Sequence, residues 1–149
     1  MRAIDVIHRS GVAIGPDRTI REAAEVMEHS GIGLLAIVDG TQLVGVVTDR
    51  DLVRRALARG LSSDTRVDGV MTSPVVTVEA DSDVREAFAT FRSHGLRRVV
   101  VVRDVAFEGT ISIDDLLVLV TSELDDLSRP VTAEMLFAHR DSGLPATVE

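Results

Sequence analysis

The sequence predicts an α+β fold of two repeated modules that pack sheet against sheet into one body. Residues 12–52 align with residues 76–116 without a gap, so the chain contains an internal duplication. The positions identical in both copies are, numbered in the first, Val12, Asp17, Arg21, Glu22, Ala23, Gly31, Val38, Gly45, Asp51 and Leu52. The order of apolar patterns predicts strand, helix, strand, strand and helix in each copy. A module of about 60 residues buries little core alone, so we expect the copies to share one.

The spacing of apolar residues defines each element in turn. A short apolar stretch opens the first copy at 12–14. Apolar residues at i, i+3, i+4 and i+7 from Ile20 then predict a helix with one buried face, ending near Gly31. The second copy repeats this pattern, with Gly95 at the helix end.

The two strands that follow are predicted to form the interior of the sheet. Residues 34–38 and 98–102 are almost continuously apolar, as is typical of strands buried on both faces. The turn at 39–41 predicts a hairpin into a strand at 43–47. A second helix is expected to close each module, over 49–59 in the first copy and from Asp114 to Ser122 or later in the second.

The chain therefore divides into two predicted modules and a tail. We expect Pro130 to end the helix before it, a short amphipathic helix at 132–139, and a frayed end. The predicted bounds are 1–64 for the first module, 65–127 for the second, with 61–70 as the linker, and 128–149 for the tail.

Composition excludes several classes of function. The chain has no cysteine, which excludes disulfides and thiolate sites, and its formal net charge is −8. An acidic surface argues against duplex DNA or an anionic membrane as the main partner. There is no signal-peptide pattern and no apolar run long enough to span a membrane, so we expect a cytoplasmic protein.

A hydroxyl and a carboxylate recur three residues apart where the last strand of each module meets its second helix. The pairs are Thr48 with Asp51 and Ser112 with Asp115. One interpretation is a capping box, in which each side chain satisfies the backbone N–H of the other residue. The other is a nucleotide site, because a helix N-terminus suits phosphate and a carboxylate can accept from ribose hydroxyls. Both interpretations can hold at once.

The duplication and its motifs resemble a tandem pair of CBS domains, named after cystathionine beta-synthase. The resemblance covers about residues 3–127 and is carried by GVVTDRDLV, GTISIDDLL, VMTSPVVTVEADSDVREAF and SHGLRRVVVV in that part of the chain. It implies that the modules pack about a pseudo-twofold axis. It also implies two clefts that bind adenosine-containing ligands such as AMP, ADP, ATP or S-adenosylmethionine.

The resemblance also assigns roles to individual residues. Asp51 and Asp115 would accept hydrogen bonds from ribose hydroxyls, and Thr48 and Ser112 would contact ribose or phosphate. The adenine would be lined by strand segments that include Val12, Ala13, Ile14, 35–37, Val76, Thr77, Val78, Val99 and its neighbours to 101. Arg97 and Arg98 would bind phosphate, and Arg50 is a further candidate in the first copy unless it points to solvent.

The two copies differ at these positions. Gly33 and Leu34 occupy the places of Arg97 and Arg98, and Ile113 occupies that of Asp49. The two clefts are therefore expected to differ, with one phosphate-binding arginine pair in the chain. From the residues alone, two arginines on an acidic protein could instead pair with carboxylates.

We predict a sensor or regulator that binds an adenine nucleotide between its modules and requires no cofactor. No nucleophile–base constellation is present, and no histidine lies at a metal-ligand spacing, so no enzyme is expected. The alternative is an interaction or oligomerisation module whose clefts are closed by its own side chains. Apolar helix faces and the tail residues 135–137 favour a homodimer. The downstream protein that would read the bound state is not identified by the sequence.

Overall fold

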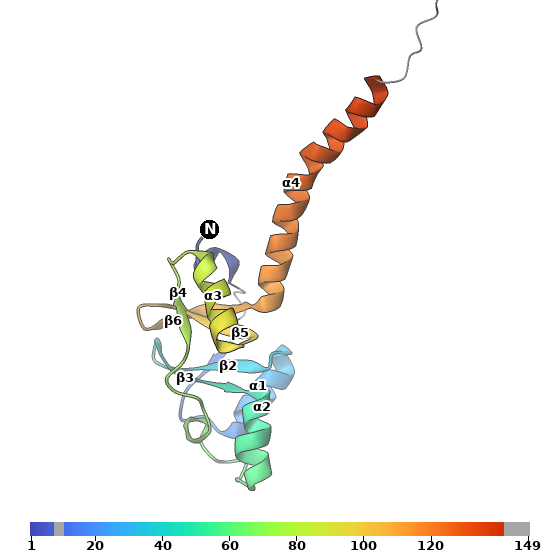
Figure 1. The fold of residues 1–149 in the computed structure, drawn as a ribbon. Coiled ribbons are helices and arrows are strands. Elements are labelled where there is room, and N and C mark those ends of the chain that lie inside the picture. The colour runs from blue at the N-terminus through green and yellow to red at the C-terminus, as the bar shows by residue number, and fades with distance from the viewer. Residues whose placement is uncertain (8–10, 142–149) are drawn as a thin grey trace, which may run out of the picture. The chain divides into compact units, whose positions relative to one another are not determined.

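Six strands form a single sheet in the computed structural model, which describes residues 1–7 and 11–141, with side chains as far as residue 130 (Figure 1). The strand order is β1-β2-β3-β6-β5-β4. Each module supplies three neighbouring strands, which confirms the predicted α+β duplication. The strands are β1 (Ala13–Ile14), β2 (Leu34–Asp39), β3 (Gln42–Thr48), β4 (Thr77–Glu79), β5 (Arg98–Arg103) and β6 (Ala106–Ser112).

The internal strands β2 and β5 are buried as their apolar runs predict. Leu35, Ala36 and Ile37 are fully buried in β2, and residues 99–102 are buried in β5. Strands β2 and β5 each have a short parallel neighbour on one side and an antiparallel hairpin partner on the other. The duplicated sequence therefore gives a duplicated local topology.

The two halves of the sheet meet along the starts of β3 and β6. Gln42 and Ala106 are register partners in an antiparallel pair. The Leu43 N–H donates to the Val105 carbonyl at 2.9 Å, and the Phe107 N–H donates to the Thr41 carbonyl at 3.2 Å. The modules thus join edge to edge into one sheet, and β3 and β6 run in opposite directions from this junction.

The first helix of each module begins and ends where its sequence predicts. Helix α1 (Ile20–Ser30) starts with a capping box between Thr19 and Glu22, and helix α3 (Val84–His94) starts with an Asp83 cap. Gly31 and Gly95 follow the two helices with φ of 64° and 61°, a left-handed conformation that glycine adopts without a steric penalty.

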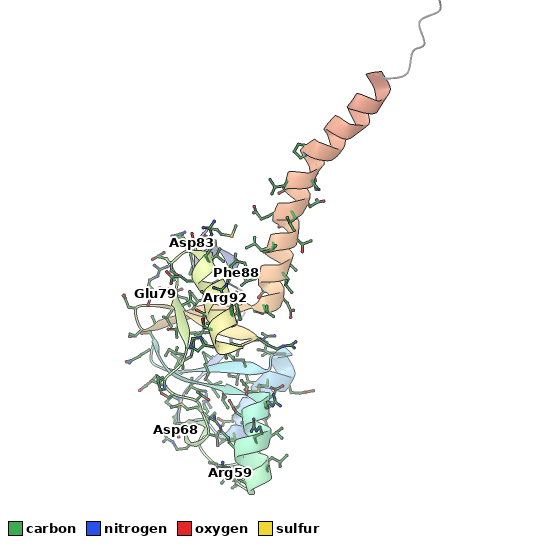
Figure 2. All side chains as sticks on the ribbon, viewed as in Figure 1. Arg59, Asp68, Glu79, Asp83, Phe88 and Arg92 are labelled. Atoms are coloured by element: carbon green, nitrogen blue, oxygen red, sulfur yellow. The ribbon has the colours of Figure 1, made fainter. Side chains whose placement is uncertain are left out.

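Helix α3 turns one face toward solvent. Figure 2 labels Asp83, Phe88 and Arg92 along it, and Phe88 is exposed although it is apolar. The buried face carries Val84, Ala87 and Phe91.

The predicted helix over 49–59 forms, but its backbone changes along its length. It comprises α2 (Asp49–Asp51), a π-helical turn η2 (Leu52–Ala56) and a 3₁₀ turn η3 (Leu57–Arg59). A π turn widens the helix and is often found near functional residues. Gly60 ends this helix with φ of 68°, as its position predicts.

The segments that precede the two modules are exchanged. The 3₁₀ turn η1 (Ala3–Val6) contacts α3 and β6 of the second module, and the Ala3 N–H donates to the Ser82 carbonyl at 2.8 Å. The equivalent turn η4 (Val67–Gly69) belongs to the first module. There, Val67 and Val70 are buried in the cluster formed by α1, β2 and β3. The stretch predicted as a linker at 61–70 is therefore in part a component of the first core.

Helix α4 (Ile113–Asp141) is longer than predicted. From Asp114 onward it belongs to a second compact unit, separate from Met1–Ile113. The expectation that Pro130 ends a helix is wrong, because α4 continues through it. A proline removes one backbone donor and crowds the preceding turn, a local cost that helix-forming residues on both sides can offset.

The predicted short helix at 132–139 is the last part of α4, and its side chains lie outside the described residues. The last residues, 142–149, which were predicted to fray, also lie outside the described residues.

Candidate functional site

The strand registers gather the predicted ligand residues into two equivalent sets. In the first module, Ala13 is aligned with Ala36 across β1 and β2, and Leu34 with Thr48 across β2 and β3. The first set therefore lies at one end of β1, β2 and β3; it contains Val12, Ala13, Ile14, Thr48, Arg50 and Asp51.

The second module repeats this arrangement. Thr77 is aligned with Val100, and Arg98 with Ser112. The second set contains Val76, Thr77, Val78, Arg97, Arg98, Val99 and Ser112. Because β3 and β6 run apart from their junction, the two sets lie at different strand ends of the common sheet.

Thr48 and Asp51 form the capping box that their spacing predicts. The Asp51 N–H donates to Thr48 Oγ1 at 3.0 Å, and the Thr48 N–H donates to Asp51 Oδ2 at 3.0 Å. The second carboxylate oxygen, Oδ1, lies 3.8 Å from Nε of Arg55. The Asp51 side chain is 20% exposed, so it is held firmly without being sealed from a ligand.

Arg55 is a component of this site that sequence reasoning missed. Its Nη1 donates to the Val70 carbonyl and to Thr72 Oγ1, each at 3.1 Å. It therefore connects the helix that carries Asp51 to the segment that starts the second copy. The available signal was the difference between copies, because Leu119 occupies the equivalent position.

Gly45 allows this same segment to approach β3 closely. A β-carbon on Gly45 would overlap the sulfur of Met71 and would lie 3.1 Å from the Thr72 carbonyl. Val46 and Thr72 exchange two backbone hydrogen bonds, of 3.1 and 2.7 Å. The register also shifts beside Gly45, so both a β-bulge and a close approach account for the glycine. The group that approaches Gly45 is the Met71–Thr72 segment of this chain.

The second set differs from the first in charge. Arg97 and Arg98 are exposed, and neither forms an ion pair with any residue that the structure describes. The Ile113 N–H donates to the Arg97 carbonyl at 3.0 Å, just as the Asp49 N–H donates to the Gly33 carbonyl at 3.0 Å. The surface salt-bridge interpretation of the arginine pair therefore has no partner among the described side chains.

At the first set a carboxylate stands where the second set has arginine. A β-carbon on Gly33 would lie 2.9 Å from Oδ2 of Asp49, so the acidic side chain covers the glycine. The second set has Ile113 in place of Asp49. The arginine pair therefore stands at one strand end only, as the sequence differences predict.

The two residues of the second hydroxyl–carboxylate pair belong to different units of the structure. Ser112 ends β6 and is only 9% exposed, while Asp115 is the third residue of α4 and lies in the second unit. Its role as an acceptor for ribose stays a prediction.

Shifted pKa values occur at ion pairs outside both sets. Arg66 donates a hydrogen bond to Asp68 at 2.8 Å and holds the pKa of that carboxyl below its ordinary value. The pKa of Arg103 is raised by its hydrogen bond to Glu108 and by the charge of Asp81. The backbone of Arg2 lowers the pKa of Asp5.

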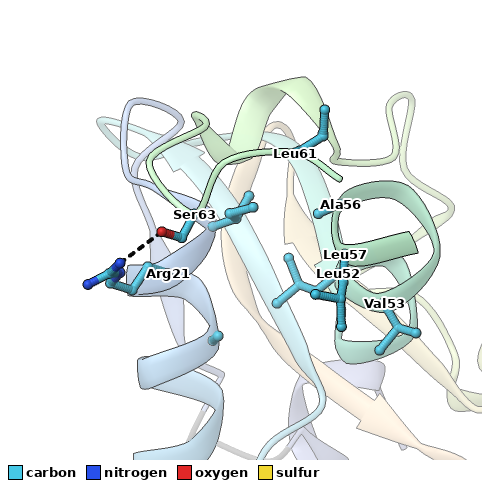
Figure 3. Close-up of a pocket in the computed structure, with 9 residues that line it drawn as sticks. Arg21, Leu52, Val53, Ala56, Leu57, Leu61 and Ser63 are labelled. Carbon is cyan, nitrogen blue, oxygen red and sulfur yellow. Dashed lines mark hydrogen bonds between the residues drawn. The ribbon is translucent and has the colours of Figure 1, made fainter. Parts of the chain in front are cut away.

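A cavity of 280 Å³ lies on the helical side of the first module rather than at the strand ends (Figure 3). The hydrogen bond from Arg21 to Ser63, at 2.8 Å, crosses one side of it. Its lining is mainly apolar and consists of Ile20, Arg21, Ala24, Leu52, Val53, Ala56, Leu57, Leu61 and Ser63. The sequence did not predict this cavity, because residues from four separate segments form it.

A neighbouring cavity of 450 Å³ includes Gly33 and Asp49 in its lining, but no residue of the first set lines it. Among the residues that the structure describes, no group of acidic and histidine side chains could hold a metal ion. Within the same residues, no helix combines the length and the apolar character needed to cross a bilayer.

Comparison with known proteins identifies this class of duplicated module. A family model described as CBS domain matches residues 3–58 and 67–122. The chain therefore belongs to the CBS domain family, as its resemblance predicted.

Individual relatives support the same assignment. The chain is 37% identical over 99 residues to the uncharacterized protein YlbB of Bacillus subtilis, which covers 65% of this chain and 67% of that protein. It is similar to the CBS domain protein PAE2072 from Pyrobaculum aerophilum complexed with AMP, with 32% identity and a TM-score of 0.71 over 78% of this chain and 90% of that one. It is also similar to the CBS domain pair of protein MJ0100 in complex with 5-methylthioadenosine and S-adenosyl-L-methionine. That match has 25% identity and a TM-score of 0.72 over 83% of this chain and 98% of that one.

Proposed function

We propose that this chain is a regulatory protein that binds an adenosine-containing ligand at its paired strand ends. The observation that carries the proposal is the Thr48–Asp51 pair. It fixes a partly exposed carboxylate at a helix N-terminus, where Oδ2 accepts the Thr48 N–H and Oδ1 faces Arg55 Nε at the ion-pair distance of 3.8 Å. A carboxylate held in this way is suited to accept from ribose hydroxyls. The relatives that hold AMP or S-adenosyl-L-methionine support this ligand class.

The two sets are proposed to prefer different ligands of this class. Arg97 and Arg98 provide two guanidinium groups without carboxylate partners among the described side chains, and arginine matches the geometry of phosphate. The first set has Asp49 beside Gly33, which would repel a phosphate. We therefore assign phosphorylated ligands to the second set, and neutral or cationic adenosine compounds to the first, with Arg50 outside the contact.

A second candidate function is a scaffold with closed clefts. Two of the strand segments assigned to adenine are already covered, because residues 35–37 and 99–101 are buried at 2% exposure or less. Met71 also fills the space beside Gly45. These observations favour a protein that acts only through its surfaces, in which case no nucleotide would stabilise it.

We further propose that the chain is a homodimer. The cavity between α1 and η2–η3 is bordered by Val53, Leu57 and Leu61, whose side chains are exposed and apolar. Pairing of this face with its copy would remove that apolar surface from water.

A thermal-shift screen separates the two candidate functions. The full chain is heated with AMP, ADP, ATP or S-adenosylmethionine, and with GMP as the control for the purine. A rise in the unfolding temperature with an adenosine compound, and a smaller one with GMP, supports the sensor. Equal unfolding temperatures with all five compounds would reject it in favour of the scaffold.

A further inference from the structure

Helix α4 carries a continuous apolar stripe that is exposed along its length. The stripe consists of Ile113, Leu117, Val120, Leu124 and Leu127, which are between 38% and 70% exposed. Its members alternate by steps of four and three residues, and Val131 continues the spacing in the sequence. Glu134 occupies the next position and ends the pattern.

This spacing identifies the kind of surface that fits the stripe. A repeat of about 3.5 residues keeps apolar side chains on one seam of a helix, and this seam packs against another helix with the same repeat. The stripe of α4 therefore fits another helix with the same repeat.

Charge around the stripe is compatible with pairing between identical chains. Beside it lie Asp114 and the neutral residues Thr121 and Ser128 on one flank, and Glu123 on the other. The remaining charges of this part of α4 lie on the opposite side, where Arg129 pairs with Asp125 at 3.0 Å. Copies of a chain with net charge −8 can thus meet along this seam without bringing most of their carboxylates together.

The same charges disfavour a membrane surface as the occupant. Amphipathic helices that bind anionic lipid carry lysine or arginine on their polar face. The polar face of α4 carries Asp125 and Asp126, with Arg129 already in an ion pair. Most of the stability of a helix in a protein comes from packing of its apolar face, so a helix partner along the stripe would stabilise α4.

We propose that α4 is an assembly helix, whose stripe packs against the α4 stripe of another copy of this chain. The proposal is independent of the proposed ligand and adds a second contact to the proposed homodimer. Leucines at 117 and 124 with β-branched residues at 113 and 120 are the arrangement that favours more than two helices over a pair, and light scattering measures the number of chains.

The test compares the mass in solution of full-length variants by light scattering at tens of micromolar. In the stripe variant, Leu124→Glu and Leu127→Glu place carboxylates in the seam. In the control, Val118→Glu and Ser122→Glu add the same charge on the opposite side, where Val118 is 71% exposed. Circular dichroism checks that both variants keep their helices, since glutamate is a good helix former.

We expect the wild-type and control proteins to have the mass of two or more chains, and the stripe variant to have fewer chains or at least tenfold weaker association. A third variant, Leu57→Glu, tests the face proposed for the homodimer. If the stripe variant has the same mass in solution and the same strength of association as the control, the proposal that α4 is an assembly helix is wrong. The proposed contact through the Leu57 face would not be affected by that result. A monomeric wild-type protein overturns both contacts.

The absence of cysteine from the chain provides a second readout. A single Leu124→Cys protein treated with a short bismaleimide should form cross-linked dimers, and Ser122→Cys should form few. Equal cross-linking at the two positions would contradict the seam.

Discussion

Replacing Asp51 with asparagine separates its structural role from its proposed role in binding. The Asp51 carboxylate makes two kinds of contact: Oδ2 accepts the Thr48 N–H at 3.0 Å, and Oδ1 faces Arg55 at 3.8 Å. Asparagine keeps one oxygen for the Thr48 N–H, but it puts an amide donor where a ribose hydroxyl would need an acceptor.

The expected loss of stability is small. The cap hydrogen bond is retained, and the lost charge at the helix N-terminus costs about 0.3–1 kcal/mol. The contact with Arg55 is too long and too exposed to add much, because such pairs contribute about 0–1 kcal/mol. We therefore expect the free energy of unfolding to fall by about 1 kcal/mol or less in the absence of ligand.

The expected loss of affinity is larger. A hydrogen bond to a charged acceptor contributes about 1.5–3 kcal/mol, so losing it should weaken binding by roughly ten- to a hundredfold. Calorimetry with S-adenosylmethionine, a ligand of the class assigned to the first set, measures this loss, and urea denaturation measures stability.

The matched control is Asp39→Asn, which removes the same charge at the opposite end of β2. Asp39 is exposed and has no role in the proposed ligand contacts. Equal affinity losses in the two variants would mean that charge in general, rather than contact with Asp51, governs binding. Unchanged affinity in the Asp51 variant, with a ligand that binds the wild-type protein, would refute its proposed role.

Three further predictions concern other residues. The combined substitution Arg97→Ala and Arg98→Ala should abolish one salt-sensitive ATP site per chain in calorimetry. Two equal ATP sites that both survive the substitution would contradict the proposal that only the second set binds phosphate. Gly45→Ala should lower the free energy of unfolding by about 1–3 kcal/mol, because the added methyl group overlaps Met71; a neutral effect in urea denaturation would show that this contact yields easily. The pKa of Asp68 is lowered on folding, so its contribution is present above its unfolded pKa of 3.8 and is lost as pH falls through the lower folded value. Asp68→Asn should therefore reduce the fall in the free energy of unfolding below about pH 4. If the variant loses as much stability at acid pH as the wild-type protein, other carboxylates cause the fall.

The local features of this fold could be predicted from the sequence because each depends on residues close together in the chain. The capping box needs only Thr48 and Asp51, and the end of α1 needs only Gly31. The buried strands follow from continuous apolar runs, and the equivalence of the two sets follows from the gapless repeat. The sequence places Arg97 and Arg98 at the start of a strand. Only the structure shows that neither forms an ion pair with a described residue.

The remaining features depend on contacts between distant segments. Arg55 reaches Val70 and Thr72, which no helical pattern of 49–59 reveals. The cavity beside Leu57 combines residues from α1, η2, η3 and the segment at 61–63. Pro130 was predicted to end a helix from its local cost alone, whereas α4 continues through it to Asp141.

The exchange of the opening segments makes the two modules depend on each other. Val67 and Val70 are buried in the first module although they begin the second copy, and Ala3 is buried although it precedes the first. Burial of one such valine side chain contributes about 1.5–3 kcal/mol, and the net stability of a domain is only about 5–15 kcal/mol. Division of the chain at the predicted boundary after residue 64 would thus remove a large share of the first module's stability.

The same exchange determines what a ligand at the first set would meet. Met71 and Thr72 lie against Gly45 and Val46, and Arg55 connects Thr72 to the helix of Asp51. A ligand held by Asp51 would therefore bear on residues of both copies, even though its ribose contact belongs to one. Any shift of Arg55 on binding would change the hydrogen bonds of the Val70–Thr72 segment, and that segment leads directly into β4 at the far edge of the sheet. Occupancy of one strand end can in this way reach the other module through the backbone, without a change in the contact between β3 and β6.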